Sequence, residues 1–168
     1  QVVTGWMEGE PRARVADVLR LVQPRVTAET FQALLLQAPF VSDIWQLLAM
    51  NDALAKAYWA AVKPQSPFPG EEAEAVQLLM TAGRPWAAFE AIQWAPERLD
   101  ASLLVALLRT MADGEVKPHP TIWERQIREA VKTAEEGDTL TADEKAQLEW
   151  LWLPVMGCRW MGDKDISI

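Results

Sequence analysis

Residues 71–111 read EEAEAVQLLMTAGRPWAAFEAIQWAPERLDASLLVALLRTM, and this stretch predicts three helices in succession. In its first part, apolar side chains recur at steps of three and four residues, which is the period of an amphipathic helix. Gly83 suits the left-handed conformation that ends a helix, and Pro85 suits the first turn of the next one. The first two helices therefore form a tight antiparallel hairpin. The inner face of the first helix is predicted to hold Ala73, Val76, Leu79 and Met80.

The same stretch continues into a third helix. Pro96 stops the second helix, and Asp100 is a favourable N-cap for the third, because its side chain can accept a hydrogen bond from a free backbone N–H group. The third helix carries a wide apolar band, which indicates burial against its neighbours. We expect that band to consist of Leu103, Leu104, Leu107, Leu108 and Met111.

Helical patterns also fill the rest of the chain. Thr141 and Glu144 form a reciprocal capping box at the start of the last helix, which is predicted to run toward Pro154. No sustained strand alternation and no Asn-Gly or Asp-Gly hairpin is present. The pattern predicts an all-α fold, an irregular stack of antiparallel helical hairpins with about nine helices. Starts outside the central stretch are expected at Pro11, Thr27, Ser42, Asn51, Pro120 and Thr141.

The apolar period also predicts which side chains of these outer helices face inward. The acidic pair Glu71 and Glu72 stands at a helix start, where the helix dipole favours negative charge, and the pair Glu135 and Glu136 at a helix end is expected to be in solvent. In the first, second and last helices the inner positions include Val18, Leu19, Leu34, Leu35, Leu148, Leu151 and Trp152. In the long helix before the last they are Trp123, Ile127, Ala130, Val131 and Ala134.

One domain is expected from the length, since a chain of 168 residues can bury roughly 70% of its unfolded surface around one core. We divide it into an extended lead-in (1–10), a helical-repeat domain (11–156) and a C-terminal tail (157–168). Prolines at positions 64, 67 and 69 exclude a helix between 63 and 70, so a loop seam is predicted there. Gln1 in place of an initiator methionine indicates a piece of a longer protein.

The composition argues against several classes of partner. A net charge of −8 argues against nucleic acid and against an anionic membrane surface, since both are bound mainly through Lys and Arg. The apolar runs are too short for a membrane-spanning helix, which needs about 20 residues. A single cysteine, Cys158, allows no internal disulfide, and we expect a cytoplasmic protein.

Catalytic and metal-binding signatures are absent from the sequence. His119 is the only histidine and stands between two prolines, so no zinc ligand set can be assembled around it. Cys158 has no oriented base, and Asp163 with Asp165 lacks the later ligands of a calcium loop. We therefore predict no metal, no cofactor and no enzymatic activity.

Two short motifs carry a family resemblance. Residues 78–88, LLMTAGRPWAA, place small side chains at a helix crossing and resemble a tetratricopeptide-like or HEAT-like hairpin. Residues 148–154, LEWLWLP, together with 83–88, also resemble helical-repeat regions of large bacterial multidomain proteins. The resemblance implies an α-solenoid with a scaffolding or sensing role, and it brings no catalytic residues.

Nine tryptophans make this composition unusual. One interpretation is that most of them fill helix crossings in the core. A second role is suggested by a stripe at i, i+4, i+7 and i+8 on one side of a helix, because rigid aromatic side chains dominate affinity in peptide grooves. This candidate partner-binding stripe consists of Trp86, Glu90, Gln93 and Trp94.

The function predicted from these observations is protein–protein interaction or scaffolding, with a protein, a peptide or neighbouring domains of the parent chain as partner. Two alternatives stay open. One is a small-molecule sensor or hydrolase, in which Glu90 or another carboxylate would meet buried tryptophan in a pocket between helices. The other is self-association into a homodimer through the second apolar side of the last helix, formed by Ala146, Trp150 and Leu153.

Overall fold

The computed structural model describes residues 13–114, 120–137 and 140–156. Within these ranges all regular structure is helical and no strand occurs, which confirms the all-α class. The α-helices are α1 (Ala13–Val22), α2 (Ala28–Gln37), α3 (Ser42–Leu48), α4 (Asp52–Ala61), α5 (Glu72–Thr81), α6 (Pro85–Ile92), α7 (Ala101–Asp113), α8 (Pro120–Glu136) and α9 (Ala142–Met156). Two 3-10 helices, η2 (Gln23–Arg25) and η3 (Pro96–Arg98), connect some of them.

Several positions singled out in the sequence lie outside the described residues. They are the lead-in (1–10), Pro11, His119, Cys158, Asp163 and Asp165, and the tail (157–168). The side chain of Trp123 also lies outside the described part. None of the described helices combines the length and the apolar character that crossing a membrane requires.

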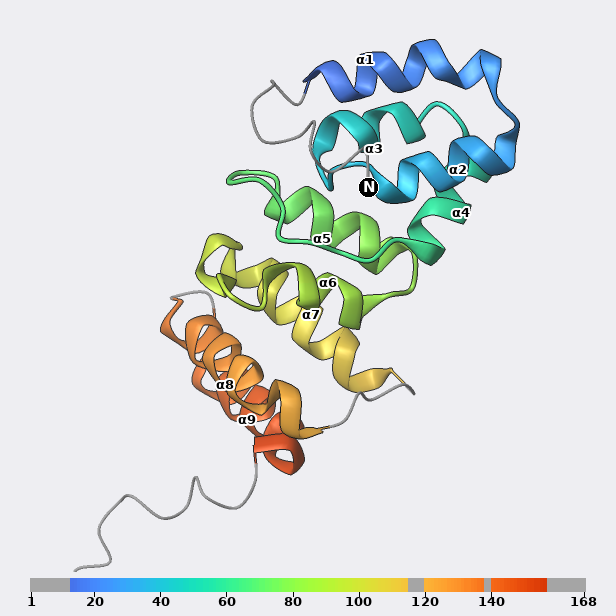
Figure 1. Cartoon of the computed structure of the whole chain (residues 1–168). Coiled ribbons are helices and arrows are strands. Elements are labelled where there is room, and N and C mark those ends of the chain that lie inside the picture. The colour runs from blue at the N-terminus through green and yellow to red at the C-terminus, as the bar shows by residue number, and fades with distance from the viewer. Residues whose placement is uncertain (1–12, 115–119, 138–139, 157–168) are drawn as a thin grey trace, which may run out of the picture.

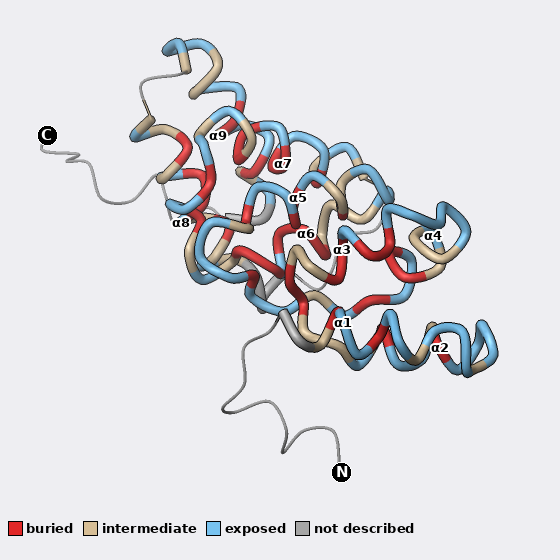
Figure 2. The backbone as a smooth tube through the Cα atoms, turned by 90° about the horizontal axis from the view of Figure 1, so that it is seen from above, coloured by how far each residue is buried: buried red, intermediate tan, exposed pale blue. Residues whose placement is uncertain are grey.

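The helices succeed one another along the length of the molecule in chain order (Figure 1). Helices α1 to α4 form one end, α5 to α7 the middle, and α8 with α9 the other end. The α5–α6 pair makes the most extensive helix–helix contact, and α7 packs against α6, α8 and α9. Buried residues lie where helices face each other, and exposed residues follow the outer sides (Figure 2). Apolar residues from α1 to α9 join in one continuous core.

The central hairpin has the predicted turn. Gly83 has a φ of 72°, and its N–H donates to the Met80 carbonyl, while the Arg84 N–H donates to the Leu79 carbonyl, both at 2.9 Å. This pair of hydrogen bonds is the Schellman motif, which satisfies the last carbonyls of α5. Pro85 then occupies the first turn of α6, so the sharp reversal between antiparallel helices follows from two adjacent local signals.

The buried side of α5 differs from the prediction at several positions, and Met80 is only half-buried. Val76 and Leu79 are buried as expected, but Ala73 is exposed and Ala75 is buried. The stripe starts at Glu72, a charged residue whose position at a helix start had been explained by the helix dipole. Because Glu72 lies inside, the buried face consists of Glu72, Ala75, Val76 and Leu79, at steps of three and four.

The third helix of the central unit forms as predicted. Asp100 caps α7, and its Oδ1 accepts a hydrogen bond from the Ser102 backbone N–H at 2.8 Å. Helix α6 already ends at Ile92, and Pro96 lies buried in η3 between the two helices. The buried residues of α7 are Leu104, Val105, Leu107, Leu108 and Met111, with Leu103 partly buried.

The N-terminal helices confirm the predicted caps. The Thr27 hydroxyl accepts from the Thr30 N–H, and the Asn51 side chain accepts from the Leu54 N–H. The prediction that Val18 and Leu34 face inward was wrong, because Val18 is 47% exposed and Leu34 is 36% exposed. Helix α1 lies at the end of the molecule (Figure 1), and its described buried residues are Ala16 and Leu19. The core of this end is an aromatic cluster with edge-to-face and tilted contacts among Phe40, Trp45, Tyr58 and Trp59.

The C-terminal pair α8 and α9 is buried mainly along one side of each helix. Ile127, Ala130, Val131 and Ala134 are buried as predicted. The Thr141 N–H donates to a carboxylate oxygen of Glu144 at 2.9 Å and the Glu144 N–H donates to the Thr141 hydroxyl at 3.3 Å, which confirms the capping box.

Two expectations about this pair were wrong. Pro154 lies inside α9, which continues to Met156, and Leu151 is 38% exposed although Leu148 and Trp152 are buried. The prediction that Glu135 and Glu136 are both solvated was wrong for Glu135. One of its carboxylate oxygens is buried, and burial together with the Glu149 charge raises the pKa of Glu135 despite the nearby Lys145.

Candidate functional site

The proline-containing loop 63–70 is held at its start by Arg84 from the α5–α6 turn. The Arg84 Nη1 atom donates to the carbonyl of Trp59 at 2.7 Å and to the carbonyl of Val62 at 2.8 Å. These carbonyls belong to the last turn and the C-cap of α4, where backbone acceptors have no partner within the helix. A single guanidinium therefore fixes the point at which the loop leaves α4.

The end of the loop is held by Glu71, the residue that precedes α5. Its carboxylate accepts from the Ser42 backbone N–H at 3.2 Å and from the Ser42 hydroxyl at 2.6 Å. The residue before Ser42, Val41, makes no side-chain capping bond, so Glu71 closes the N-terminus of α3 from a distant part of the chain. A carboxylate is favourable there, because the N-terminal end of a helix carries partial positive charge.

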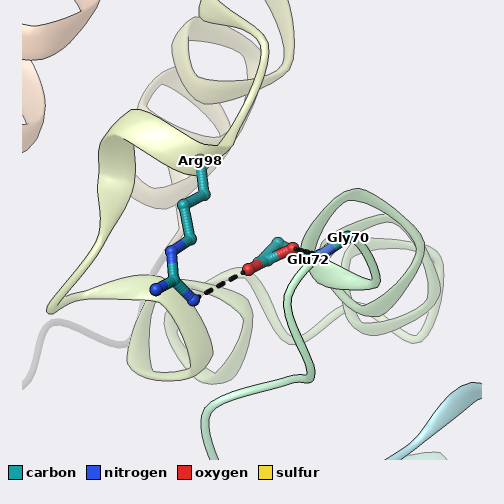
Figure 3. Close-up of polar contacts among 3 residues, drawn as sticks. All are labelled: Gly70, Glu72 and Arg98. Carbon is teal, nitrogen blue, oxygen red and sulfur yellow. Dashed lines mark hydrogen bonds and ion pairs between the residues drawn. The ribbon is translucent and has the colours of Figure 1, made fainter.

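Glu72 is the one charged residue that the described part of the chain buries, at 5% exposure. Its Oε2 accepts from the Gly70 N–H at 2.6 Å, and its Oε1 lies 3.2 Å from Nη1 of Arg98 in η3 (Figure 3). Burial alone would raise the pKa of Glu72, but hydrogen bonds from the backbone N–H groups of Glu72 and Gly70, together with the Arg98 guanidinium, lower the pKa below its ordinary value. The carboxylate is therefore held in its charged form.

A hollow of about 280 Å³ opens beside this ion pair, between the loop and the end of α6. Its volume is slightly below the usual range for small-molecule sites, which starts at roughly 300 Å³. Trp94 lines it and is 72% exposed. The apolar part of the lining comes from Pro67, Ala91, Ile92 and Ala95, and the polar part from Ser66, Glu72 and Arg98. The hollow is a shallow apolar site next to an exposed indole.

The predicted stripe on α6 is divided between two environments. Trp86 is half-buried and meets Trp152 of α9 edge to face, with ring centroids 6.0 Å apart. Glu90 is exposed, and the Gln93 amide donates to the Glu90 backbone carbonyl at 3.1 Å. Trp94 is exposed and lies at the hollow. The structure therefore leaves Trp94 and Glu90 open to a partner, while α9 covers Trp86.

The self-association residues lie on the outer side of α9. Trp150 is 74% exposed, Ala146 is exposed and Leu153 is half-buried. The opposite side of the helix supplies Leu148 and Trp152 to the core. The predicted two-sided character of α9 is thus present, with one side packed and the other in solvent.

The carboxylate that lines the hollow is engaged in hydrogen bonds within the protein. Glu72, the carboxylate that lines it, has a lowered pKa, whereas a general acid needs a raised one. Both of its oxygens already accept hydrogen bonds. Among the described residues, no three His, Cys, Asp or Glu side chains are grouped so that they could hold a metal ion.

Four residues that shape this site were not identified from the sequence: Glu71, Glu72, Arg84 and Arg98. Their partners lie 22 to 29 positions away along the chain, apart from the contact between Glu72 and Gly70. The helical period of apolar residues predicts which side of a helix is buried. It does not predict which distant carbonyl or hydroxyl group a charged side chain will contact. The one available signal was the position of Glu72 in the apolar series Ala75, Val76 and Leu79.

No protein-family model, no curated protein and no solved structure matches the chain. The resemblance to helical-repeat hairpins therefore rests on residues 78–88 and 148–154 alone. Function has to be inferred from the geometry around Trp94 and along α9.

Proposed function

We propose that the chain is a protein-interaction or scaffolding module, built as an α-solenoid-like stack of helical hairpins within a larger cytoplasmic protein of bacterial type. The succession of helices along the molecule in chain order supports the stack (Figure 1). The close α5–α6 hairpin and the packing of each later helix on its predecessor agree with it. Such stacks present long surfaces to partners, because each hairpin contacts mainly its neighbours.

The observation that carries the proposal is the exposure of Trp94 beside an apolar hollow with a rigid wall. An indole that is 72% exposed leaves a large apolar area in water, which binding of a partner would cover. The wall is preorganised, because Arg84 and Glu72 hydrogen-bond the two ends of the loop. Preorganisation lowers the entropy lost when a partner binds. Tryptophan is also enriched among the residues that dominate interface energies.

The experiment compares two equally exposed tryptophans. Peptides are selected from a displayed library on the wild-type chain, and their affinities are then measured for Trp94→Ala and Trp150→Ala. We expect Trp94→Ala to weaken the selected peptides by at least about tenfold, roughly 1.4 kcal/mol, while Trp150→Ala leaves them unchanged. Equal losses in both variants, or no loss in either, would remove the hollow as the binding site. Unfolding curves of both variants establish that the fold is intact.

Self-association is a second candidate function, and the exposure of Trp150 favours it. An indole that is 74% exposed on the outer side of α9, flanked along the helix by Ala146 and Leu153, forms an apolar strip that a second copy of the chain could cover. The sensor or hydrolase alternative has no comparable support, because Glu90 is exposed and Glu72 is held in its charged form.

A further inference from the structure

The sequence around Trp94 carries more acidic than basic residues. The stretch 85–100 contains four charged residues, namely Glu90, Glu97, Arg98 and Asp100. The single basic one, Arg98, forms the ion pair with Glu72, so its charge is balanced within the protein. The three acidic side chains are all exposed. A partner that approaches the Trp94 hollow therefore meets a surface that attracts positive charge, in a chain whose net charge is −8.

Glu90 in α6 and Trp94, which follows α6, are four positions apart and lie on the same side of the helix axis. Gln93, which follows the last residue of α6, keeps right-handed helical angles with φ −54° and ψ −22°. Trp94 therefore continues the course of the helix, and the side chains of Glu90 and Trp94, four positions apart, lie one above the other. This spacing places the Glu90 carboxylate and the Trp94 indole on the same exposed side of the chain.

The form of the hollow suits a long basic side chain. Lys and Arg carry an apolar stem with a charge at its end, and such stems lie along apolar surface while the charge stays in a polar environment. Pro67, Ala91, Ile92 and Ala95 offer the apolar surface, and the Trp94 indole offers the preferred aromatic face for a cation. Glu90 adds a carboxylate beside that face.

We propose that the hollow beside Trp94 binds a basic segment of a protein partner, with the stem of an arginine or lysine along the apolar wall and its cation on the Trp94 indole near Glu90. This inference rests on the proposed function, since it specifies the partner of the same site. An acidic segment is disfavoured, because Arg98 is already paired with Glu72 and the exposed carboxylates would repel it.

The test uses three short fluorescent peptides of equal length that differ only in charge. The basic peptide combines arginine and serine around a central leucine; the others carry glutamine or glutamate in place of arginine. Binding to the whole chain is measured by fluorescence anisotropy at low and at high salt. We expect the basic peptide to bind most tightly, with an affinity that falls as salt increases.

Variants separate a specific site from general attraction to an acidic protein. Trp94→Ala should weaken the basic peptide by at least about tenfold. Glu90→Gln should weaken it by about threefold, and Glu74→Gln, which removes an exposed carboxylate from α5, should change it by less. Equal effects of Glu90→Gln and Glu74→Gln would mean that the peptide senses only net charge, which overturns the inference.

The remaining outcomes distinguish the inference from the proposed function. Tighter, Trp94-dependent binding of the glutamate or glutamine peptide would overturn the basic partner and leave an interaction site at the hollow. Basic-peptide binding that is unchanged by Trp94→Ala, or absent from all three peptides, also overturns the basic partner. The hollow as an interaction site fails only if the library-selected peptides lose affinity equally in Trp94→Ala and Trp150→Ala, or lose none in either.

Discussion

Glu71 before α5 accepts two hydrogen bonds from Ser42 at the start of α3, although the two residues are 29 positions apart. One carboxylate thus closes the N-terminus of α3 and joins the start of α3 to the start of α5. Arg84 and Glu72 act on the proline-containing loop from α5 and its following turn. The wall of the Trp94 hollow is therefore fixed by charged side chains whose partners are backbone groups, a hydroxyl and one guanidinium.

Removing the Glu71 carboxylate should destabilise the protein. We expect Glu71→Ala to lower the free energy of unfolding by about 0.5 to 2 kcal/mol, the usual cost of losing an N-terminal helix cap. Glu74→Ala is the matched control, because Glu74 is exposed, and it should change stability by less than about 0.5 kcal/mol. Urea denaturation measures both. Ser42→Ala combined with Glu71→Ala should cost less than the sum of the single changes, and strict additivity would show that the two side chains are not coupled.

The Glu72 carboxylate should make stability depend on acid pH. Its pKa in the folded protein is lowered from 4.5, so the stability it contributes is present above its pKa in the unfolded chain and is lost as the pH falls through the lower folded value. Glu72→Gln lacks this contribution. The stability difference between wild type and Glu72→Gln, from urea denaturation, should therefore be largest near neutral pH and should shrink below about pH 4.5. A difference that is constant down to about pH 3 would contradict the folded-state pKa shift.

Gly83 should tolerate alanine poorly for reasons of backbone conformation alone. A Cβ at Gly83 would meet no atom within 4 Å, but its φ of 72° is unfavourable for any residue with a Cβ. We expect Gly83→Ala to cost about 1 kcal/mol. Gly114→Ala is the control: φ there is −72°, so alanine should be neutral or stabilise the protein by up to about 1 kcal/mol. Equal thermal midpoints for the two variants would mean that the turn is not held in the left-handed conformation.

Leu107 should behave as a central core residue. It is fully buried in α7, so Leu107→Ala removes buried methyl groups, leaves a cavity and should cost roughly 2 to 5 kcal/mol. Leu21→Ala makes the same chemical change at a site that is 65% exposed, and we expect less than about 0.5 kcal/mol there. Chemical denaturation compares the two. A Leu107→Ala effect within about 0.5 kcal/mol would mean that α7 does not pack as described.

The outer side of α9 should reveal whether the chain associates with itself. If Trp150 forms a dimer seam, analytical ultracentrifugation should show concentration-dependent association of the wild type and a monomer for Trp150→Glu, because the new charge would have to be buried. Trp94→Glu, at a similarly exposed tryptophan that follows α6, should associate like the wild type. A wild type that is monomeric at all concentrations removes self-association as a function.

Local features of the fold could be predicted residue by residue, because each depends on neighbours in the sequence. The structure has helix caps and a turn at the predicted residues, namely the caps at Thr27, Asn51 and Asp100 and the turn at Gly83. The helix starting near Thr141 was predicted for the same reason. In contrast, Pro154 was predicted to end α9 and lies inside it, which shows that a single local signal can be overridden by the surrounding helix.

Features of the site depended on contacts between distant segments. Trp86 and Trp94 belong to the same predicted stripe, but their surroundings differ. Trp152 packs against Trp86, which is half-buried, whereas Trp94 is exposed. Glu71 and Glu72 are adjacent and identical, but one reaches Ser42 and the other Arg98. No spacing rule distinguishes these neighbours, because the difference arises from what lies opposite each side chain.

By itself the sequence determined the helical class, most helix boundaries and the hairpin at Gly83, since backbone hydrogen bonds within helices and caps join residues only a few positions apart. Only the tertiary structure decided that Glu72 is buried and that Arg84 and Glu71 hold the proline-containing loop. It also decided that Trp94 and Trp150 are the exposed ones among the tryptophans whose side chains the structure describes. These outcomes depend on which surfaces the helices bury against one another, and that choice is made by the packing of the whole chain.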